Sequence, residues 1–404
     1  MISIPVLCLA VVLAQQEPQP LVAIADVHGD FQAFRAILRR SGLIDDKDRW
    51  AGGTRHLVQM GDLLDRGPES RKAMDLLMRL EDEAKAAGGQ VTGLLGNHEV
   101  MNLTSDLRYV TRGEFAAFAR EETPAMRNQF KKALFQRIQI GHPGLRSRPW
   151  AALARQITDR HLEIAFPPGF FALRQAFSPE GRYGQWLLKK KVAHIEGKTL
   201  FLHAGLSPKY GQIPIDRFNE EAAAALNEYI AILAELDTQG AMDSSLPCLF
   251  DPVSDPLSSI TALLEYLVAI EKRAGGPAPE LKPLFDRIEK VLASPLFDYK
   301  YGPIWYRGLA LDYDQDTKVV GATKREVEAI LRFHGVDRIV IGHTVTKTKN
   351  ADVRYGGLVW AIDTGMNYAF YEGRPIALEI PETGAPQVIG LQDKAESKEP
   401  VGVR

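Results

Sequence analysis

The chain has 404 residues, of which 45% are hydrophobic and 25% are charged. These values are ordinary for a globular protein, and they exclude a disordered chain, a collagen-like fibre and a protein with several membrane spans. The 49 Lys and Arg residues and the 51 Asp and Glu residues leave a net charge of −2, so the overall charge gives no support to a nucleic-acid partner. Any anion that the protein binds must be held by a local site.

Residues 1–14 form an uncharged apolar run, MISIPVLCLAVVLA, which ends in a small residue before a polar stretch. The run is too short to span a bilayer as a mature helix, and it is typical of the apolar part of a secretory signal, although the usual basic start is missing. We therefore expect residues 1–14 to be an export signal and the mature protein to be periplasmic or secreted, with no membrane contact. The alternatives are an uncleaved anchor or a buried first strand, and without export the protein would be cytoplasmic.

Short aliphatic runs recur along the chain, and each stops at a polar cluster. In chain order the runs are LVAIA (21–25), HLVQM (56–60), VTGLL (91–95), TLFL (199–202), RIVI (338–341) and LVWAI (358–362). Helical patterns such as 31–40 and 71–87 lie between them, and this alternation predicts an α/β fold with layered packing. Polar residues at the strand ends of such a fold gather in one crevice. Because the clusters extend over nearly the whole chain, we expect one domain over 18–390 and a flexible tail at 391–404.

The polar clusters contain a set of candidate metal ligands: Asp26, His28, Asp62, Asn97, His203 and His343. Two carboxylates, one amide and three imidazoles without a thiolate suit Mn, Fe, Zn or Co better than Ca or a structural zinc. One carboxylate must bridge if each of two ions is to gain enough ligands, and Asp62 is central in the chain order. Two ions about 3.5 to 4 Å apart can activate a shared water for in-line displacement at phosphorus. We therefore expect two divalent or trivalent metal ions, with Mn preferred and Fe or Zn as alternatives.

Five clusters resemble the signature blocks of calcineurin-like metallophosphoesterases: DVHG (26–29), GDLLDRG (61–67), GNHE (96–99), HAG (203–205) and GHT (342–344). The pair GDxxDRG and GNHE is typical of the phosphoprotein phosphatase branch, and the blocks are similar to those of its bacterial Shewanella-like group. The resemblance implies an α/β/β/α sandwich with a binuclear metal centre. It also implies that a hydroxide between the two metals attacks a phosphomonoester directly.

The resemblance further implies a role for individual residues of the blocks. The implied ligands are Asp26, His28 and Asp62 for the first ion and Asp62, Asn97, His203 and His343 for the second. His98 would protonate the leaving group, and Asp65 would orient His98. Arg66 and Arg307 would bind the phosphate, and Asn97 would contact the substrate as well as a metal.

Two stretches outside the blocks, at about 104–192 and 209–298, have helical patterns and not the composition of linkers. We expect them to form helical insertions beside the metal site, where they would control which phosphates can enter. An aromatic segment follows the second insertion, with rings at Tyr299, Tyr301, Trp305 and Tyr306. Either these rings line the entrance and favour phosphotyrosine or an aryl phosphate, or part of them belongs to the core.

The function that fits these residues is hydrolysis of phosphoproteins, phosphopeptides or small aryl phosphates. Two alternatives remain: a dinucleoside polyphosphate hydrolase of the same superfamily, which would need a purine site, and a catalytically silent phosphate-binding scaffold, which the intact ligand set opposes. The sequence gives no indication of the oligomeric state. Asp363 is treated as scaffold, and no role in the site is assigned to the histidines outside the blocks, namely His56, His142, His161, His194 and His334.

Overall fold

A computed structural model describes residues 20–128, 166–238, 282–382 and 384–391. The export signal expected at 1–14, residues 392–404 of the expected tail and the middle of each expected insertion lie outside these ranges. Within the described ranges, no helix is both long enough and apolar enough to cross a membrane.

The first sheet has the strand order β12-β11-β1-β2-β3. Strands β1 (Leu21–Ile24), β2 (His56–Gln59) and β3 (Gln90–Gly93) are parallel, with β3 at one edge. On the other side of β1, strands β11 (Ile376–Ile380) and β12 (Gln387–Gly390) continue the sheet in antiparallel pairing. Helices α1 (Phe31–Arg40) and α2 (Ser70–Ala86) follow β1 and β2 and contact this sheet. Both helices match the helical patterns predicted from the sequence.

The second sheet has the order β4-β5-β8-β10-β9. Strands β5 (Thr199–Leu202), β8 (Arg338–Ile341) and β10 (Val359–Ala361) are parallel, while β4 (Ala193–Glu196) and β9 (Asp352–Arg354) pair antiparallel at the two edges. A separate small hairpin is formed by β6 (Tyr313–Asp314) and β7 (Val319–Val320). All six aliphatic runs of the sequence are therefore strands, whereas the antiparallel strands β4, β9, β11 and β12 were not predicted.

Successive side chains of a strand point to opposite faces of its sheet, and this divides the interior into two cores. Ala23 of β1 packs with Phe201 and Val340 of the second sheet, so these side chains fill the space between the sheets. Their neighbours Val22 and Ile24 point to the other face of the first sheet and join the cluster beneath the helices. The expected layered α/β/β/α arrangement is confirmed.

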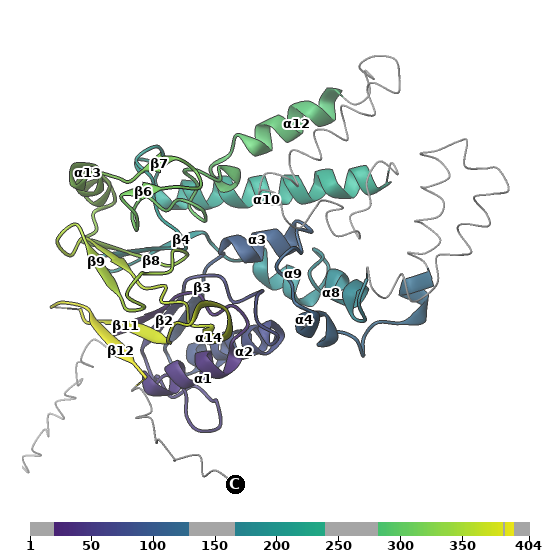
Figure 1. Ribbon diagram of the computed structural model, residues 1–404, viewed down its shortest axis with the longest axis horizontal. Coiled ribbons are helices and arrows are strands. Elements are labelled where there is room, and N and C mark those ends of the chain that lie inside the picture. The colour runs from purple at the N-terminus through teal and green to yellow at the C-terminus, as the bar shows by residue number, and fades with distance from the viewer. Residues whose placement is uncertain (1–19, 129–165, 239–281, 383, 392–404) are drawn as a thin grey trace, which may run out of the picture.

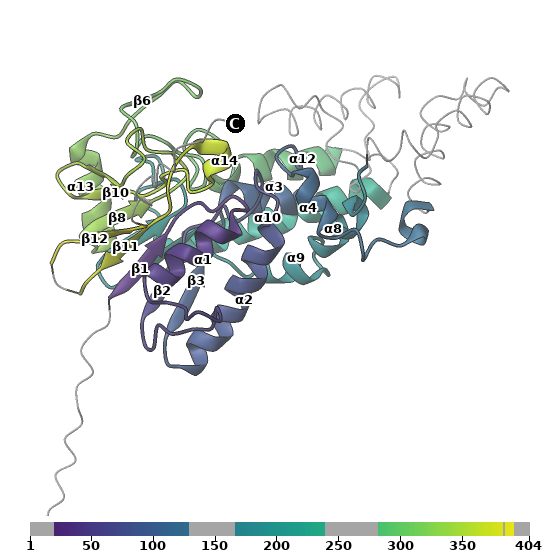
Figure 2. The same cartoon turned by 60° about the horizontal axis from the view of Figure 1, so that its bottom comes forward.

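The remaining helices are α3 (Asn97–Leu103), α4 (Arg112–Ala116), α8 (Phe170–Ala176), α9 (Arg182–Leu187), α10 (Ile215–Thr238), α12 (Lys282–Leu292), the 3-10 turn η2 (Pro295–Phe297), α13 (Lys324–His334) and α14 (Tyr368–Tyr371). Helices α4, α8, α9, α10 and α12 gather on one side of the sandwich (Figure 1 and Figure 2). They belong to the described parts of the two expected insertions, and α10 contacts both α12 and the edge strand β4. The helical pattern expected over 209–298 corresponds to α10 and α12, and its middle lies outside the described residues.

Candidate metal centre

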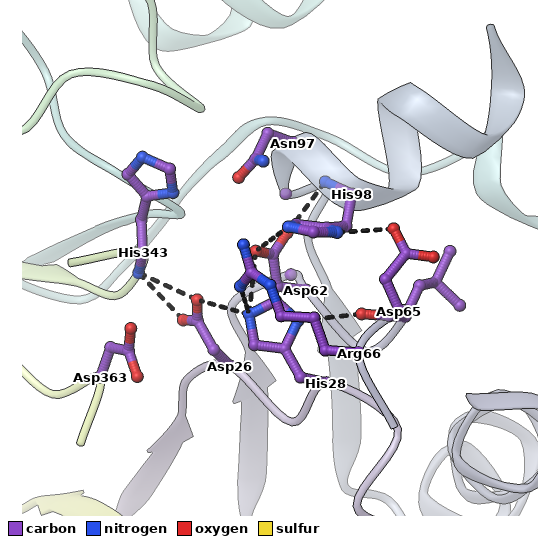
Figure 3. Close-up of polar contacts among 12 residues, drawn as sticks. Asp26, His28, Asp62, Asp65, Arg66, Asn97, His98, His343 and Asp363 are labelled. Atoms are coloured by element: carbon purple, nitrogen blue, oxygen red, sulfur yellow. Dashed lines mark hydrogen bonds and ion pairs between the residues drawn. The ribbon is translucent and has the colours of Figure 1, made fainter. Parts of the chain in front are cut away.

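The loops that follow β1, β2, β3, β5 and β8 bring the predicted ligands together in one buried site (Figure 3). Three of the residues in these loops, His28, Asp62 and His343, have left-handed backbones with φ of 48°, 53° and 65°. This conformation is uncommon for residues other than glycine, and it tends to occur where the surrounding structure holds a functional side chain in place. The tight loop conformation therefore aims side chains from distant parts of the sequence at one point.

The first cluster is formed by His28 and two carboxylates. The Nε2 atom of His28 lies 3.6 Å from Oδ2 of Asp62 and 3.9 Å from Oδ2 of Asp26. On the other side of the ring, Nδ1 donates to the backbone oxygen of Leu64 at 2.9 Å, so Nε2 carries the lone pair of the neutral ring. Burial, followed by the charge of nearby His98, holds the pKa of His28 well below its usual range. The ring is therefore neutral, which is the form that binds a metal.

The second cluster is formed by His203, His343 and Asn97. The Nε2 atom of His203 lies 3.0 Å from Oδ1 of Asn97, 3.2 Å from Nδ1 of His343 and 3.4 Å from Oδ2 of Asp62. The Nδ1 atom of His203 donates to the backbone oxygen of Met60 at 2.9 Å, which fixes the tautomer in the same way as in His28. The Nε2 atom of His343 is buried and has no hydrogen-bond partner.

Asp62 connects the two clusters. Its Oδ2 atom faces His28 on one side and His203 on the other. Possible ligand atoms within 4.8 Å of one another belong to His28, Asp62 and His98 in one group and to Asp62, His203 and His343 in the other. Burial opposes ionisation of Asp62, but the surrounding histidines, led by His203, hold its pKa well below the usual range. Burial is likewise outweighed at His203, where Asp62 and Asp26 raise the pKa to about 9. A shared carboxylate, imidazole nitrogens and an amide oxygen fit two transition-metal ions.

Asp26 ties the first loop of the site to the last one. Its carboxylate accepts the backbone N–H of His343, with Oδ1 at 2.9 Å and Oδ2 at 3.2 Å. Gly342 leaves room for this contact, because a Cβ atom there would lie 2.4 Å from Oδ1 of Asp26. The carboxylate of Asp363 lies beside that of Asp26 (Figure 3), and after burial its charge is the strongest cause of the raised pKa of Asp26. Asp363 thus lies next to a candidate ligand, where it can support the site as the scaffold residue that the sequence analysis took it to be.

His98 and Asp65 form a buried pair beside the first cluster. The Nδ1 atom of His98 lies 2.6 Å from Oδ2 of Asp65, and Asn102 donates to the other carboxylate oxygen at 3.0 Å. The Nε2 atom of His98 has no hydrogen-bond partner among the described residues and lies 3.8 Å from Oδ2 of Asp62. Burial lowers the pKa of His98 to about 4 and raises that of Asp65 to about 8, so both groups resist carrying a charge. The pair titrates as a unit and favours one shared proton with no net charge.

Arg66 reaches the edge of the first cluster. Its Nη1 atom lies 2.5 Å from Nε2 of His28 and donates to the hydroxyl of Tyr371. The guanidinium carbon is 5.1 to 5.4 Å from the ring centres of Tyr109, Phe370 and Tyr371. The rings hold the guanidinium, with its forked donors, at the edge of the first cluster.

Arg307 approaches the site from the side of the second cluster. Its Nη1 atom donates to the backbone oxygen of His343 at 3.3 Å and to Oγ1 of Thr344 at 3.2 Å. After burial, its charge is the main cause that holds the pKa of His343 well below the usual range. The two predicted phosphate-binding arginines therefore lie on opposite sides of the ligands.

The aromatic segment that was expected at the entrance divides between the site and the core. The ring of Trp305 lies 6.0 Å from that of His343, so it is next to the second cluster. Tyr306 is only 1% exposed, and the ring of Tyr301 stacks against it at 6.2 Å. Both tyrosines pack with the core, and Tyr299 lies next to Lys300, with its ring centre 5.6 Å from Nζ. Trp305 is the ring for which a contact with a candidate ligand is observed in the described part of the chain.

Several residues that support the site were not identified from the sequence. Glu99 accepts the backbone N–H groups of Asp62 at 2.7 Å, Gly96 at 2.8 Å and Leu63 at 2.9 Å. Its position as the third residue of α3 is the usual place of a capping glutamate, and this was the available signal. Tyr371 has no comparable signal, because α14 reaches Arg66 only through the tertiary structure.

Comparison with known proteins points to the family that the blocks resemble. A family model described as calcineurin-like phosphoesterase matches residues 19–230. Shewanella-like protein phosphatase 2 of Arabidopsis thaliana is 32% identical over 227 residues, which are 53% of this chain and 53% of that protein. The matched region thus spans about half the length of the plant relative. An uncharacterized protein of Schizosaccharomyces pombe is 26% identical over 377 residues, which are 92% of this chain and 80% of that protein.

A solved structure shares the fold along most of the chain. The cold-active protein-tyrosine phosphatase of a psychrophile, Shewanella sp., superposes with a TM-score of 0.53 and 21% identity, covering 92% of this chain and 80% of that one. At this identity the likeness concerns the fold alone.

Proposed function

This chain belongs to the calcineurin-like phosphoesterase family, and we propose that it is a metal-dependent phosphatase acting on phosphoproteins or phosphopeptides. The observation that carries the proposal is the position of Asp62 between two clusters of histidine ligands, with the buried pair of His98 and Asp65 at their edge. The ligands for two ions and a proton donor thus lie within one site. A phosphate-binding scaffold without activity would not need a proton donor.

The chain would bind the phosphate group between Arg66 and Arg307. Each guanidinium offers forked donors that match two oxygens of a phosphate, a geometry that lysine cannot reproduce. Two metal ions bound by the neighbouring ligands would supply an activated water and would stabilise negative charge on the phosphate. The amide of Asn97, beside His203, would contact the substrate in addition to the two arginines and would help to orient it.

His98 would deliver the proton that the leaving oxygen needs. Its Nε2 atom is free of other hydrogen bonds, and its Nδ1 atom faces Asp65. When Nε2 donates its proton to the departing oxygen, Nδ1 can take up the proton held by Asp65, so the imidazole stays neutral and the carboxylate becomes ionised. Asn102, which donates to Oδ1 of Asp65, would then stabilise that carboxylate.

We propose phosphotyrosine or another aryl phosphate as the preferred substrate. Rings stand beside both arginines, namely Tyr109, Phe370 and Tyr371 at Arg66 and Trp305 near Arg307. Tyr109 and Phe370 are 37% and 56% exposed, so a flat ring can reach them from solution. An aromatic leaving group would gain contact area there that an alkyl phosphate would not.

The test is a screen of the metal-loaded enzyme. Samples are stripped of metal and reconstituted with Mn²⁺, Fe²⁺ or Zn²⁺, and each is assayed with a phosphotyrosine peptide, the matching phosphoserine peptide and diadenosine tetraphosphate. We expect highest activity with Mn²⁺ and with the phosphotyrosine peptide. Turnover of the dinucleotide alone would instead identify a dinucleoside polyphosphate hydrolase, and no turnover with any metal would favour the silent scaffold.

We also propose that the protein is exported and acts in the periplasm or outside the cell. The proposal rests on the apolar run at residues 1–14. Residues 1–20 fused to a reporter enzyme that works only after export should produce activity in a Gram-negative host. Activity confined to a cytoplasmic reporter would contradict export.

A further inference from the structure

A second group of metal-binding side chains lies at the end of the sandwich opposite the candidate metal centre. His56 is the first residue of β2, whose other end leads to Asp62. His194 and Glu196 lie two residues apart on β4, so they share one face of the second sheet. Val58, two residues after His56, belongs to the core between the sheets, so His56 faces the second sheet. The three side chains therefore meet between the two layers.

The separations in this group match those of ligands around one small ion. The Oε2 atom of Glu196 lies 3.1 Å from Nδ1 of His56 and 3.2 Å from Nε2 of His194. Around a tetrahedral zinc ion with bonds of about 2.0 to 2.1 Å, neighbouring ligand atoms are about 3.3 Å apart. All three ligand atoms lie within 4.8 Å of one another. A small closing movement of the two rings would complete three corners of such a tetrahedron.

The surroundings hold the imidazoles in orientations that suit a metal. The Nε2 atom of His56 lies 2.8 Å from the hydroxyl of Thr92, so its other ring nitrogen is directed at Glu196. The ring of His194 stacks on that of Phe201 with 6.5 Å between the ring centres. Burial is the main cause that lowers the pKa of both histidines, that of His56 to about 4, so both rings are neutral near pH 7.

The group is also accessible from solution. The side chains of His56 and His194 are 11% and 16% exposed, whereas that of Glu196 is 44% exposed. An ion can therefore enter on the carboxylate side, and a water molecule can take the fourth position there. Two imidazoles with one carboxylate are a donor set that zinc commonly uses.

We propose that His56, His194 and Glu196 form a zinc-binding site that is separate from the metal centre and clamps the two sheets together. The ion would join β2 of the first sheet to β4 at the edge of the second. Its contribution would be to stability, because a ligand that binds the folded chain alone shifts the folding equilibrium toward that state. His56 and His194 were not recognised from the sequence as a pair, because they belong to strands that are far apart in the chain.

The first measurement is the zinc content of the full-length protein after loading and removal of unbound ion. We expect His194→Gln and Glu196→Gln to contain one zinc per chain fewer than the wild type while phosphatase activity is unchanged. The matched control is His334→Gln, a half-buried histidine whose Nε2 atom lies 3.0 Å from the backbone oxygen of Gly211, and it should keep the wild-type content. Equal zinc content in all four proteins would overturn the site and leave Glu196 as a hydrogen-bond acceptor of two imidazoles.

The second measurement separates this site from the metal centre. In a chain carrying Asp62→Ala and His343→Ala, added Zn²⁺ should still raise the melting temperature, and the further change Glu196→Gln should abolish that rise. Because neither readout uses activity, failure of the proposed phosphatase function would leave this test unaffected. A melting temperature that responds equally to Zn²⁺ with and without Glu196→Gln would contradict the proposal.

Discussion

The histidine and carboxylate side chains of the metal centre compete for protons as well as for metal ions. His203 shows this most directly, because Asp62 and Asp26 overcome the effect of burial and raise its pKa to about 9. Its neighbour His343 behaves in the opposite way, since burial and then Arg307 keep it neutral. One ligand of the second ion therefore carries a proton near pH 7, and that proton must leave before the nitrogen can bind a metal.

This competition predicts that metal affinity depends on pH. Because the pKa of His203 in the metal-free protein is raised to about 9, the proton is bound below that pH and is lost as the pH rises through it. We expect the dissociation constant of the ion that His203 binds to fall by about tenfold per pH unit between pH 7 and 9, because binding displaces one proton from His203. Titration of the stripped protein with Mn²⁺ at several pH values would measure this. An affinity that does not change in this range would contradict the raised pKa.

The role proposed for His98 is to protonate the leaving group, which differs from binding a metal. Replacing His98 should therefore affect turnover and not metal content. We expect His98→Asn to lower turnover by about 10² to 10⁴ with a phosphoserine peptide, because an alkoxide needs a proton as it departs. The loss should be much smaller with a nitrophenyl phosphate, whose leaving oxygen is far less basic. Asp65→Asn should show the same selectivity in milder form, since it disturbs the proton supply without removing the imidazole.

Metal content serves as the control for these variants, and it should stay near that of the wild type. If His98→Asn loses a metal, or if turnover falls equally with both leaving groups, His98 is a ligand or a structural residue. Another group would then protonate the product.

At the scale of elements, α3 organises the centre of the site. Its first turn contains Asn97 and His98, and its third residue, Glu99, holds the β2 loop through the backbone N–H groups of Asp62 and Leu63. The close approach of that loop requires a residue without a side chain at Gly96, where a Cβ atom would lie 2.2 Å from Oδ1 of Asp62. One helix end thus sets the positions of Asp62 and His98, the proposed bridging carboxylate and proton donor, together.

The role of Glu99 predicts a measurable loss of stability. Glu99→Gln replaces one carboxylate oxygen with an amide that cannot accept the N–H groups now bound there, and leaving a buried donor unpaired costs about 1 to 3 kcal/mol. Urea denaturation should show a fall of this size in the free energy of unfolding. Glu326→Gln is the matched control, because Glu326 is the third residue of α13 in an exposed capping box and should cost less. Equal losses in the two variants would remove the special role of Glu99.

At the scale of the whole molecule, the core between the two sheets fixes the site. Ligands come from loops of both sheets, with Asp62 following a strand of the first and His203 and His343 following strands of the second. Their distances therefore depend on the packing of the layers. Leu378 of β11 is fully buried in this core, opposite Ala23 of β1.

A cavity at Leu378 should weaken folding as a whole. We expect Leu378→Ala to lower the free energy of unfolding by about 2 to 5 kcal/mol, because the packing is lost and the space is only partly refilled. Val388→Ala, at a position of the neighbouring strand that is 41% exposed, should change it by less than about 0.5 kcal/mol. Chemical denaturation of both variants tests the difference. A small effect at Leu378 would mean that the layers can repack.

The sequence by itself determined the parallel strands, the main helices and the identity of the candidate ligands. Aliphatic runs such as 21–25 and 338–341 identify buried strands through their local composition. Blocks such as GNHE contain candidate site residues next to one another, so their side-chain types can be read directly from the sequence. Edge strands β4 and β12 were not predicted because they are partly exposed, so their side chains lack a continuous apolar signal.

Only the tertiary structure decided which side chains act together across the fold. Arg66 with the rings of α14, Glu99 with the β2 loop, and His56 with β4 are contacts between segments far apart in the chain. It likewise placed Tyr306 in the core and Trp305 beside His343, although the two rings are neighbours in sequence. Residue type records what a side chain can do chemically, whereas burial and partners depend on how the layers pack, which no local pattern encodes.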